Sequence, residues 1–290
     1  MRSTVSRLLV AALLATALSA VTTSTRIEAA PRAPSSGINN WSCRPSAAHP
    51  NPVVLIHGLG GNGPGHWAFV APVLAGAGYC VFHLTYGAPV PWIPVGGLRP
   101  IDQSARQIAG FVDDVLAATR AREVDLVGHS EGGFQSLYIP KVLGFGAKVD
   151  SVVSLAPPTH GTTAGGLVVL ADVLGIRPLV DWTLDTFGCQ ACDDLLPGGS
   201  AVRRLTTGPV AVPGVDYTII ASRADVLVTP TETSFVREPG VKNVYVQDTC
   251  PADPVGHIGM AFELGVADMI TNALDPATAR PVRCSIGLPL

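Results

Sequence analysis

Short apolar runs recur along the chain, each bounded by glycine, proline or aspartate and separated by longer mixed segments. They occupy residues 53–56, 79–84, 124–127, 149–155 and 217–221. Runs of this length suit strands that are buried on both faces of a parallel sheet. The pattern therefore predicts a central, mostly parallel sheet.

A different period appears between the second and third runs. Within residues 104–121, apolar side chains recur at helical spacing with polar residues between them, and residues 134–142 and 260–274 also read as helices. Strands that alternate with helices are typical of an α/β fold.

Residues 157–215 interrupt this alternation. A segment this long between regular elements of a compact domain is more often a lid or a binding element than a passive loop. We therefore expect a single α/β domain over residues 41–290, with residues 157–215 as a candidate lid or substrate-binding insertion.

Composition narrows the choice of partners. The chain has 290 residues, of which 47% are hydrophobic and 14% charged, so it can bury a sizeable core. Its formal net charge is -3 and it has no basic run that would track phosphates, so we expect no nucleic-acid partner. This balance favours neutral or apolar substrates, and we expect a monomer.

The N-terminus has the organisation of an export signal. Arg2 and Arg7 give the chain a positively charged start. An apolar run over residues 8–20 follows them and is too short to span a bilayer. We expect residues 1–30 to be a signal peptide, cut somewhere between residues 20 and 33, and the mature protein to be secreted and extracellular. The alternative is an uncleaved signal anchor.

The six cysteines of an exported chain most simply form three disulfides, although spacing alone leaves their pairing open. Cys189 and Cys192 also have the spacing of redox and metal sites. Neither a second such pair nor a nearby pair of histidines accompanies them, so we expect no metal.

The segment Leu-Val-Gly-His-Ser-Glu-Gly-Gly, residues 126–133, places Ser130 between a predicted strand and a predicted helix. Strand, tight turn and helix form the nucleophile elbow, in which the serine hydroxyl projects above the sheet. Glycines at 128 and 132 leave room for a strained serine. The bare motif is weak in a chain with 31 glycines, and a plain glycine-rich turn is the alternative, so this context carries the interpretation of Ser130 as a nucleophile.

A serine nucleophile needs an acid and a base later in the chain. His257 is the only histidine after residue 160 and lies in a glycine-flanked loop, which favours it as the base over a surface histidine. Asp225 follows the run 217–221, at the strand end where α/β sheets place functional groups, so it is the candidate acid. Asp248 and Asp253, closer to His257 in sequence, stay open as competitors.

Acyl transfer also needs two backbone N–H donors for the oxyanion. We assign them to Glu131, at the start of the predicted helix, and to Leu59, after His57 and Gly58 close the first apolar run. His57 is then a structural hydrogen-bonding residue. The alternatives are a plain glycine-rich turn and a phosphate loop, of which the phosphate loop lacks its Gly-Lys-Ser/Thr ending.

Together, residues 53–59, 124–133, 217–230 and 250–259 resemble the secreted class 2 lipases and esterases of the α/β-hydrolase superfamily, of the actinobacterial type, and more distantly yeast lipase B. The resemblance runs from about Trp41 to Cys284 and includes the segment 156–163. It implies an α/β-hydrolase fold without a cofactor. The resemblance further implies that Ser130 is the nucleophile, Asp225 the acid and His257 the base. The oxyanion donors would be Leu59 and Glu131.

The resemblance also implies a disulfide pattern and one departure. Cys43 would pair with Cys80 and Cys250 with Cys284, which leaves Cys189 and Cys192 to each other. Glu131 stands where lipase B has a glutamine, and a carboxylate there would disfavour a developing oxyanion.

We therefore expect a secreted serine hydrolase that cleaves carboxylic esters, acylglycerols above all, through an acyl-enzyme. Its partners would be small-molecule or lipid esters, with transient contact to a lipid surface left open. The apolar segments around residues 167–174 and 179–184 either line an acyl pocket or pack in the core. The alternatives are a short-chain esterase, a polyester hydrolase, or a catalytically silent binding protein with a broken triad.

Overall fold

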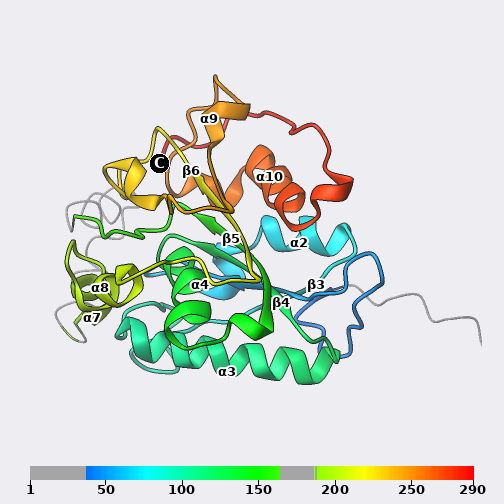
Figure 1. Ribbon diagram of the computed structural model, residues 1–290, viewed down its shortest axis with the longest axis horizontal. Coiled ribbons are helices and arrows are strands. Elements are labelled where there is room, and N and C mark those ends of the chain that lie inside the picture. The colour runs from blue at the N-terminus through cyan, green and yellow to red at the C-terminus, as the bar shows by residue number, and fades with distance from the viewer. Residues whose placement is uncertain (1–36, 164–185, 187) are drawn as a thin grey trace, which may run out of the picture. The chain divides into compact units, whose positions relative to one another are not determined.

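The computed structural model describes residues 37–163, 186 and 188–290. Its strands form one seven-stranded sheet in the order β1-β3-β2-β4-β5-β6-β7, and every neighbouring pair is parallel (Figure 1). The strands are β1 (Gly37–Ile38), β2 (Val53–Ile56), β3 (Cys80–His83), β4 (Val124–His129), β5 (Val149–Leu155), β6 (Asp216–Ala221) and β7 (Val241–Tyr245). The prediction of a parallel sheet from five apolar runs is confirmed.

Two strands were not predicted, and both lack the apolar signal. β1 has two residues, and β7 is partly exposed along its length. Short or half-buried edge strands do not need the continuous apolar runs of the central strands. Since β1 pairs with β3, the sheet begins slightly before residue 41.

Side chains alternate between two cores, one on each face of the sheet. Val54 and Ile56 face the first core, whereas Val53 and Leu55 face the second. Helices α3 (Ile101–Thr119) and α4 (Glu131–Val142) cover the first face, and α2 (Val70–Gly76) and α10 (Leu264–Leu274) cover the second (Figure 1).

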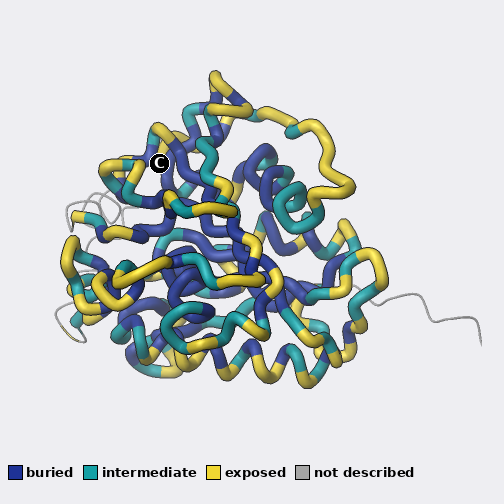
Figure 2. The backbone as a smooth tube through the Cα atoms, in the orientation of Figure 1, coloured by how far each residue is buried: buried dark blue, intermediate teal, exposed yellow. Residues whose placement is uncertain are grey.

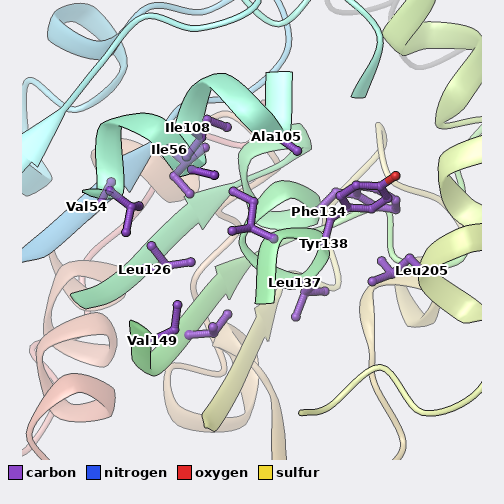
Figure 3. Close-up of a cluster of buried hydrophobic side chains, with 14 of the residues drawn as sticks. Val54, Ile56, Ala105, Ile108, Leu126, Phe134, Leu137, Tyr138, Val149 and Leu205 are labelled. Atoms are coloured by element: carbon purple, nitrogen blue, oxygen red, sulfur yellow. The ribbon is translucent and has the colours of Figure 1, made fainter. Parts of the chain in front are cut away.

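The first core shows how the sheet and helices meet. Figure 3 shows Leu126 and Val149 of the sheet in the same cluster as Phe134 and Leu137 of α4. The strands in the middle of the sheet are buried almost throughout, as the dark blue tube in Figure 2 shows. Because the frame is packed on both faces, it can hold the loops at its strand ends in fixed positions.

The helix predicted over residues 260–274 is two elements, the short turn η3 (Gly259–Phe262) and α10. Glu263 separates them because its carboxylate accepts hydrogen bonds from the backbone N–H groups of Gly265 and Val266, at 2.8 and 2.6 Å. It thereby caps the start of α10.

Within the insertion, helices α7 (Gln190–Asp194) and α8 (Ser200–Thr206) are described, whereas the apolar segments around residues 167–174 and 179–184 lie outside the described residues. The backbone N–H of Gln190 donates to the carbonyl of Leu98, and the Asp194 carboxylate accepts from the N–H of Ile101. These bonds tie α7 to the start of α3. The remaining short helices are α1 (Gly63–His66), α9 (Val246–Thr249), η1 (Gly146–Lys148), η2 (Thr231–Ser234) and η4 (Pro276–Thr278).

The three disulfides follow the pattern that the resemblance implied. Cys43 pairs with Cys80, Cys189 with Cys192, and Cys250 with Cys284. Among the helices that are described, none is long and apolar enough to cross a membrane.

Candidate active site

Ser130 lies in the tight turn between β4 and α4, as the elbow prediction requires. Its backbone is at φ 57° and ψ -122°, a strained conformation for a residue with a Cβ. The turn closes because Gly128 and Gly132 have no side chains: a Cβ on the first would clash with the carbonyl of the second, and one on the second with the carbonyl of Ile56. The Ser130 N–H donates to the Leu155 carbonyl at 2.8 Å, which fixes the turn against β5.

Asp225 and His257, far apart in sequence, meet in the structure. Nδ1 of His257 lies 2.6 Å from Oδ2 of Asp225, and both side chains are almost completely buried. Oδ1 of Asp225 accepts from the N–H groups of Leu227 and Val228. Burial alone raises the pKa of Asp225, but the His257 ring and these two N–H groups outweigh it and hold the pKa below its ordinary value.

The competing aspartates have other partners. Asp248 forms an exposed ion pair with Arg223 at 2.7 Å. Oδ1 of Asp253 accepts from the N–H groups of Val255 and Gly287. Of the three candidates, only Asp225 is paired with the His257 ring.

A cavity of about 320 Å³ opens at this edge of the sheet and is lined by Ser130, His257, Leu59 and Glu131. Four of the five predicted site residues thus share one pocket, and Asp225 lies behind His257. The Ser130 side chain is thus exposed to the space of this cavity. Much of the remaining lining is apolar, namely Leu195, Leu196, Leu227, Val228, Ile258 and Phe262.

The loop after β2 keeps one donor available. The N–H of Gly60 donates to Gly96 and that of Gly61 to Gly58, while Gly96 donates back to Gly61. Within the described residues, the N–H groups of Leu59 and Glu131 have no partner. Two free N–H groups that border one cavity with a serine can accept a developing oxyanion.

His57 has a structural role, in line with the expectation from sequence. Nδ1 lies 2.8 Å from the Gly58 carbonyl, which can only accept, so Nδ1 carries the proton and Nε2 accepts from the Tyr86 N–H. Burial lowers the pKa of His57 to about 4, so the ring is neutral at neutral pH.

Sequence reasoning missed a pair of hydrogen-bonded histidines, His66 and His129, at the pocket. Nε2 of His129 lies 2.9 Å from the His257 carbonyl and must donate to it, so Nδ1 of His129 accepts from Nε2 of His66 at 2.9 Å. Burial lowers the pKa of His129 to about 3 and the pKa of His66 well below its usual value. This neutral pair joins α1 to the backbone of His257; its only sequence signal was the histidine before Ser130.

Among the described residues, no group of three or more His, Cys, Asp or Glu side chains is placed so that it could hold a metal ion. Cys189 and Cys192, the pair with metal-site spacing, are joined in a disulfide, and Cys192 lines the cavity. Cys192, held by this disulfide, therefore forms part of the pocket wall.

The chain matches known proteins in family, sequence and fold. A model of the alpha/beta hydrolase family matches residues 53–281. This chain is 32% identical to triacylglycerol lipases from Pseudarthrobacter phenanthrenivorans and Vibrio cholerae, over 46% and 52% of its own length. The chain covers 40% and 46% of those proteins, less than half of their length.

Solved structures share the fold at lower identity. Aspergillus fumigatus lipase B matches with a TM-score of 0.59 and 18% identity, over 84% of this chain and 61% of that one. A serine hydrolase from Cycloclasticus zankles matches with a TM-score of 0.52 and 16% identity, over 79% of this chain and 92% of that one.

Proposed function

Because the chain belongs to the alpha/beta hydrolase family, we propose that it hydrolyses carboxylic esters through a triad of Ser130, His257 and Asp225. The observation that carries this proposal is the buried His257–Asp225 pair at a cavity that Ser130 also lines. A broken triad would have favoured a silent binding protein, and all three residues are present.

The reaction begins when the Ser130 hydroxyl attacks the ester carbonyl and His257 Nε2 takes its proton. Asp225 holds Nδ1–H of the ring, which keeps Nε2 free as the base and stabilises the imidazolium. The N–H groups of Leu59 and Glu131 donate to the oxyanion. His257 then protonates the leaving alcohol, and water, activated by the same ring, releases the acid from Ser130.

We propose acylglycerols as the favoured substrates. The apolar lining of the cavity suits an acyl chain, and the similar proteins from Pseudarthrobacter and Vibrio are named triacylglycerol lipases. A series of nitrophenyl esters from short to long acyl chains, run beside an emulsified triglyceride, tests this choice. Activity confined to the shortest esters would make the protein a short-chain esterase, and activity on a polyester film would make it a polyester hydrolase.

We further propose that the protein is exported. The charged and then apolar start of the chain is typical of a signal peptide, and three disulfides are most stable in an oxidising compartment. The mass of the mature protein, taken from the culture medium, should show a cut between residues 20 and 33. Intact residues 1–30 in a cell-bound protein would instead indicate a signal anchor.

Ser130→Ala tests the reaction itself. Turnover should fall roughly a million-fold, because no other group would form the acyl-enzyme. Ser136→Ala is the matched control, since Ser136 is a buried serine of α4, the helix that follows Ser130, and does not line the cavity. Near-normal turnover by a folded Ser130→Ala protein would refute the proposed nucleophile.

A further inference from the structure

Glu131 supplies an oxyanion donor with its backbone, but its side chain is a separate feature. The side chain is completely buried, and neither carboxyl oxygen has a hydrogen bond of good geometry within the described residues. It forms no ion pair there, and the charged group whose field reaches it, Asp194, has the same sign. An ionised carboxylate in this position would be buried without compensation.

The nearest polar neighbours favour the protonated form. The Tyr86 hydroxyl lies beside the carboxyl, but its only proton is donated to the His57 carbonyl at 2.7 Å. Its oxygen can therefore only accept from Glu131. On the other side, the Gln135 amide nitrogen donates to the Ile101 carbonyl, and its amide oxygen is buried with no partner. A neutral carboxylic acid has the proton that these oxygens lack.

The carboxyl also supports the oxyanion loop. A Cβ on Gly97 would lie 2.5 Å from Oε2 of Glu131 and 3.0 Å from the Cα of Leu59, so the acid and the loop meet at this glycine. The adjoining Gly96 exchanges backbone hydrogen bonds with Gly60 and Gly61 of the same loop. Both proposed oxyanion donors are therefore attached to structure that the Glu131 side chain contacts.

We propose that Glu131 is a positioning residue held as a neutral carboxylic acid beneath the oxyanion site, and that its ionisation at alkaline pH slows ester turnover. This inference rests on the proposed function for its effect on rate, but the protonation state stands on the buried geometry alone. It also accounts for an acidic residue beside the nucleophile, where a carboxylate would oppose catalysis.

Within the described residues, the groups that face Glu131 carry no positive charge that would stabilise its anion. Tyr86 is a neutral phenol, His57 is a neutral ring, and Asp194 on α7 is acidic, while Gly96 and Gly97 carry no titratable group. Burial, as the largest cause, raises the pKa of Glu131 well above its ordinary range and outweighs the opposing influence of Gln135 and Tyr86. The acid is therefore neutral below that raised pKa and becomes an uncompensated anion above it.

The test compares pH profiles of kcat and KM on a soluble nitrophenyl ester, corrected for uncatalysed hydrolysis. In the wild type, kcat should fall on the order of a hundred-fold as Glu131 ionises, because two like charges then lie close together in the transition state. KM should stay level, because the bound ester is neutral. Glu131→Gln keeps an amide donor and cannot ionise, so the ratio of its kcat at alkaline pH to that at neutral pH should stay near one.

Asp125→Asn is the matched control, since Asp125 is another buried acid and does not line the cavity. It should keep the wild-type alkaline fall. An unchanged fall in Glu131→Gln, or its loss in Asp125→Asn, would overturn the proposal.

Infrared spectra give a readout that needs no substrate and no variant. The wild type at neutral pH should show a protonated carboxyl stretch that shifts when glutamate is labelled with ¹³C and disappears as the pH rises. Labelled aspartate separates the Asp125 band from it. Absence of a protonated glutamate band would overturn the proposal even if ester turnover is normal, and its presence would uphold the neutral acid even if no ester is cleaved.

Discussion

Two buried acids lie near opposite ends of strand β4, and their surroundings differ. Asp125 is near the amino end of the strand, and Glu131 comes just after its carboxyl end. Burial raises the pKa of both, to about 8 for Asp125. Asp125 faces the acidic Asp150 and Glu123, whereas Glu131 faces a phenol, an amide and the loop of the candidate oxyanion site.

The difference lies in the edge of the sheet that each acid occupies. Parallel strands gather their carboxyl ends at one edge, where the connecting loops bring Ser130, Asp225 and His257 together. Changes at this edge should act on turnover. Changes at the opposite edge should act on stability alone.

After the loss already expected for Ser130→Ala, the largest effect should come from Asp225→Asn, at the carboxyl-end edge. Turnover should fall about ten thousand-fold, because the amide would leave His257 in the wrong tautomer, by analogy with serine proteases. Steady-state kinetics on a nitrophenyl ester measures the change. If Asp248→Asn or Asp253→Asn causes the loss instead, the acid is misplaced.

Next in size is the Cys250–Cys284 bridge, which closes a span of 34 residues that contains His257. Changing both cysteines to serine should lower the unfolding free energy by roughly 3–4 kcal/mol. Activity should be lost at temperatures below the variant's own unfolding midpoint, because His257 would no longer be held in its catalytic position.

The Cys189–Cys192 double variant is the control for this bridge. Its ring spans three residues and restricts the unfolded chain little, so urea unfolding should change far less. Equal losses of activity in the two double variants would contradict the link between the longer bridge and the base.

At the amino-end edge, Asp125→Asn should stabilise the protein by about 2–4 kcal/mol at neutral pH. The raised pKa means that the folded wild type holds a proton that the unfolded chain releases, so wild-type stability falls as the pH rises from about 4 to about 8. The gain should therefore grow with pH over that window in urea unfolding. A gain that is constant with pH would argue against a neutral Asp125.

The smallest effect should come from His129→Asn, at the carboxyl-end edge. Its dependence on pH should be opposite to that of Asp125→Asn. His129 has a pKa lowered from 6.5 to about 3, so wild-type stability falls as the pH drops below about 6.5. His129→Asn removes this penalty while losing hydrogen bonds. Its destabilisation, measured by urea unfolding, should shrink by about 1.4 kcal/mol per pH unit below that point. A constant destabilisation would mean that His129 takes up a proton in the folded protein as readily as in the unfolded chain.

The local sequence determined the frame and the identity of the candidate nucleophile. Central strands are buried on both faces, so each needs a continuous apolar run that can be recognised in the sequence. The elbow requires glycines on both sides of Ser130. Edge strands β1 and β7 carried no such signal. The break at Glu263 was missed because an N-cap inside an apolar stretch does not disturb helical spacing.

Tertiary structure alone decided which side chains meet. Three aspartates were candidates for the acid, and only the packing of the loop after β6 against the His257 loop pairs one of them with the base. The same applies to His66 with His129, and to Glu131 with Tyr86, since hydrogen bonds between distant segments leave no local period in the sequence. Burial, which makes these groups neutral, is likewise a property of the folded chain.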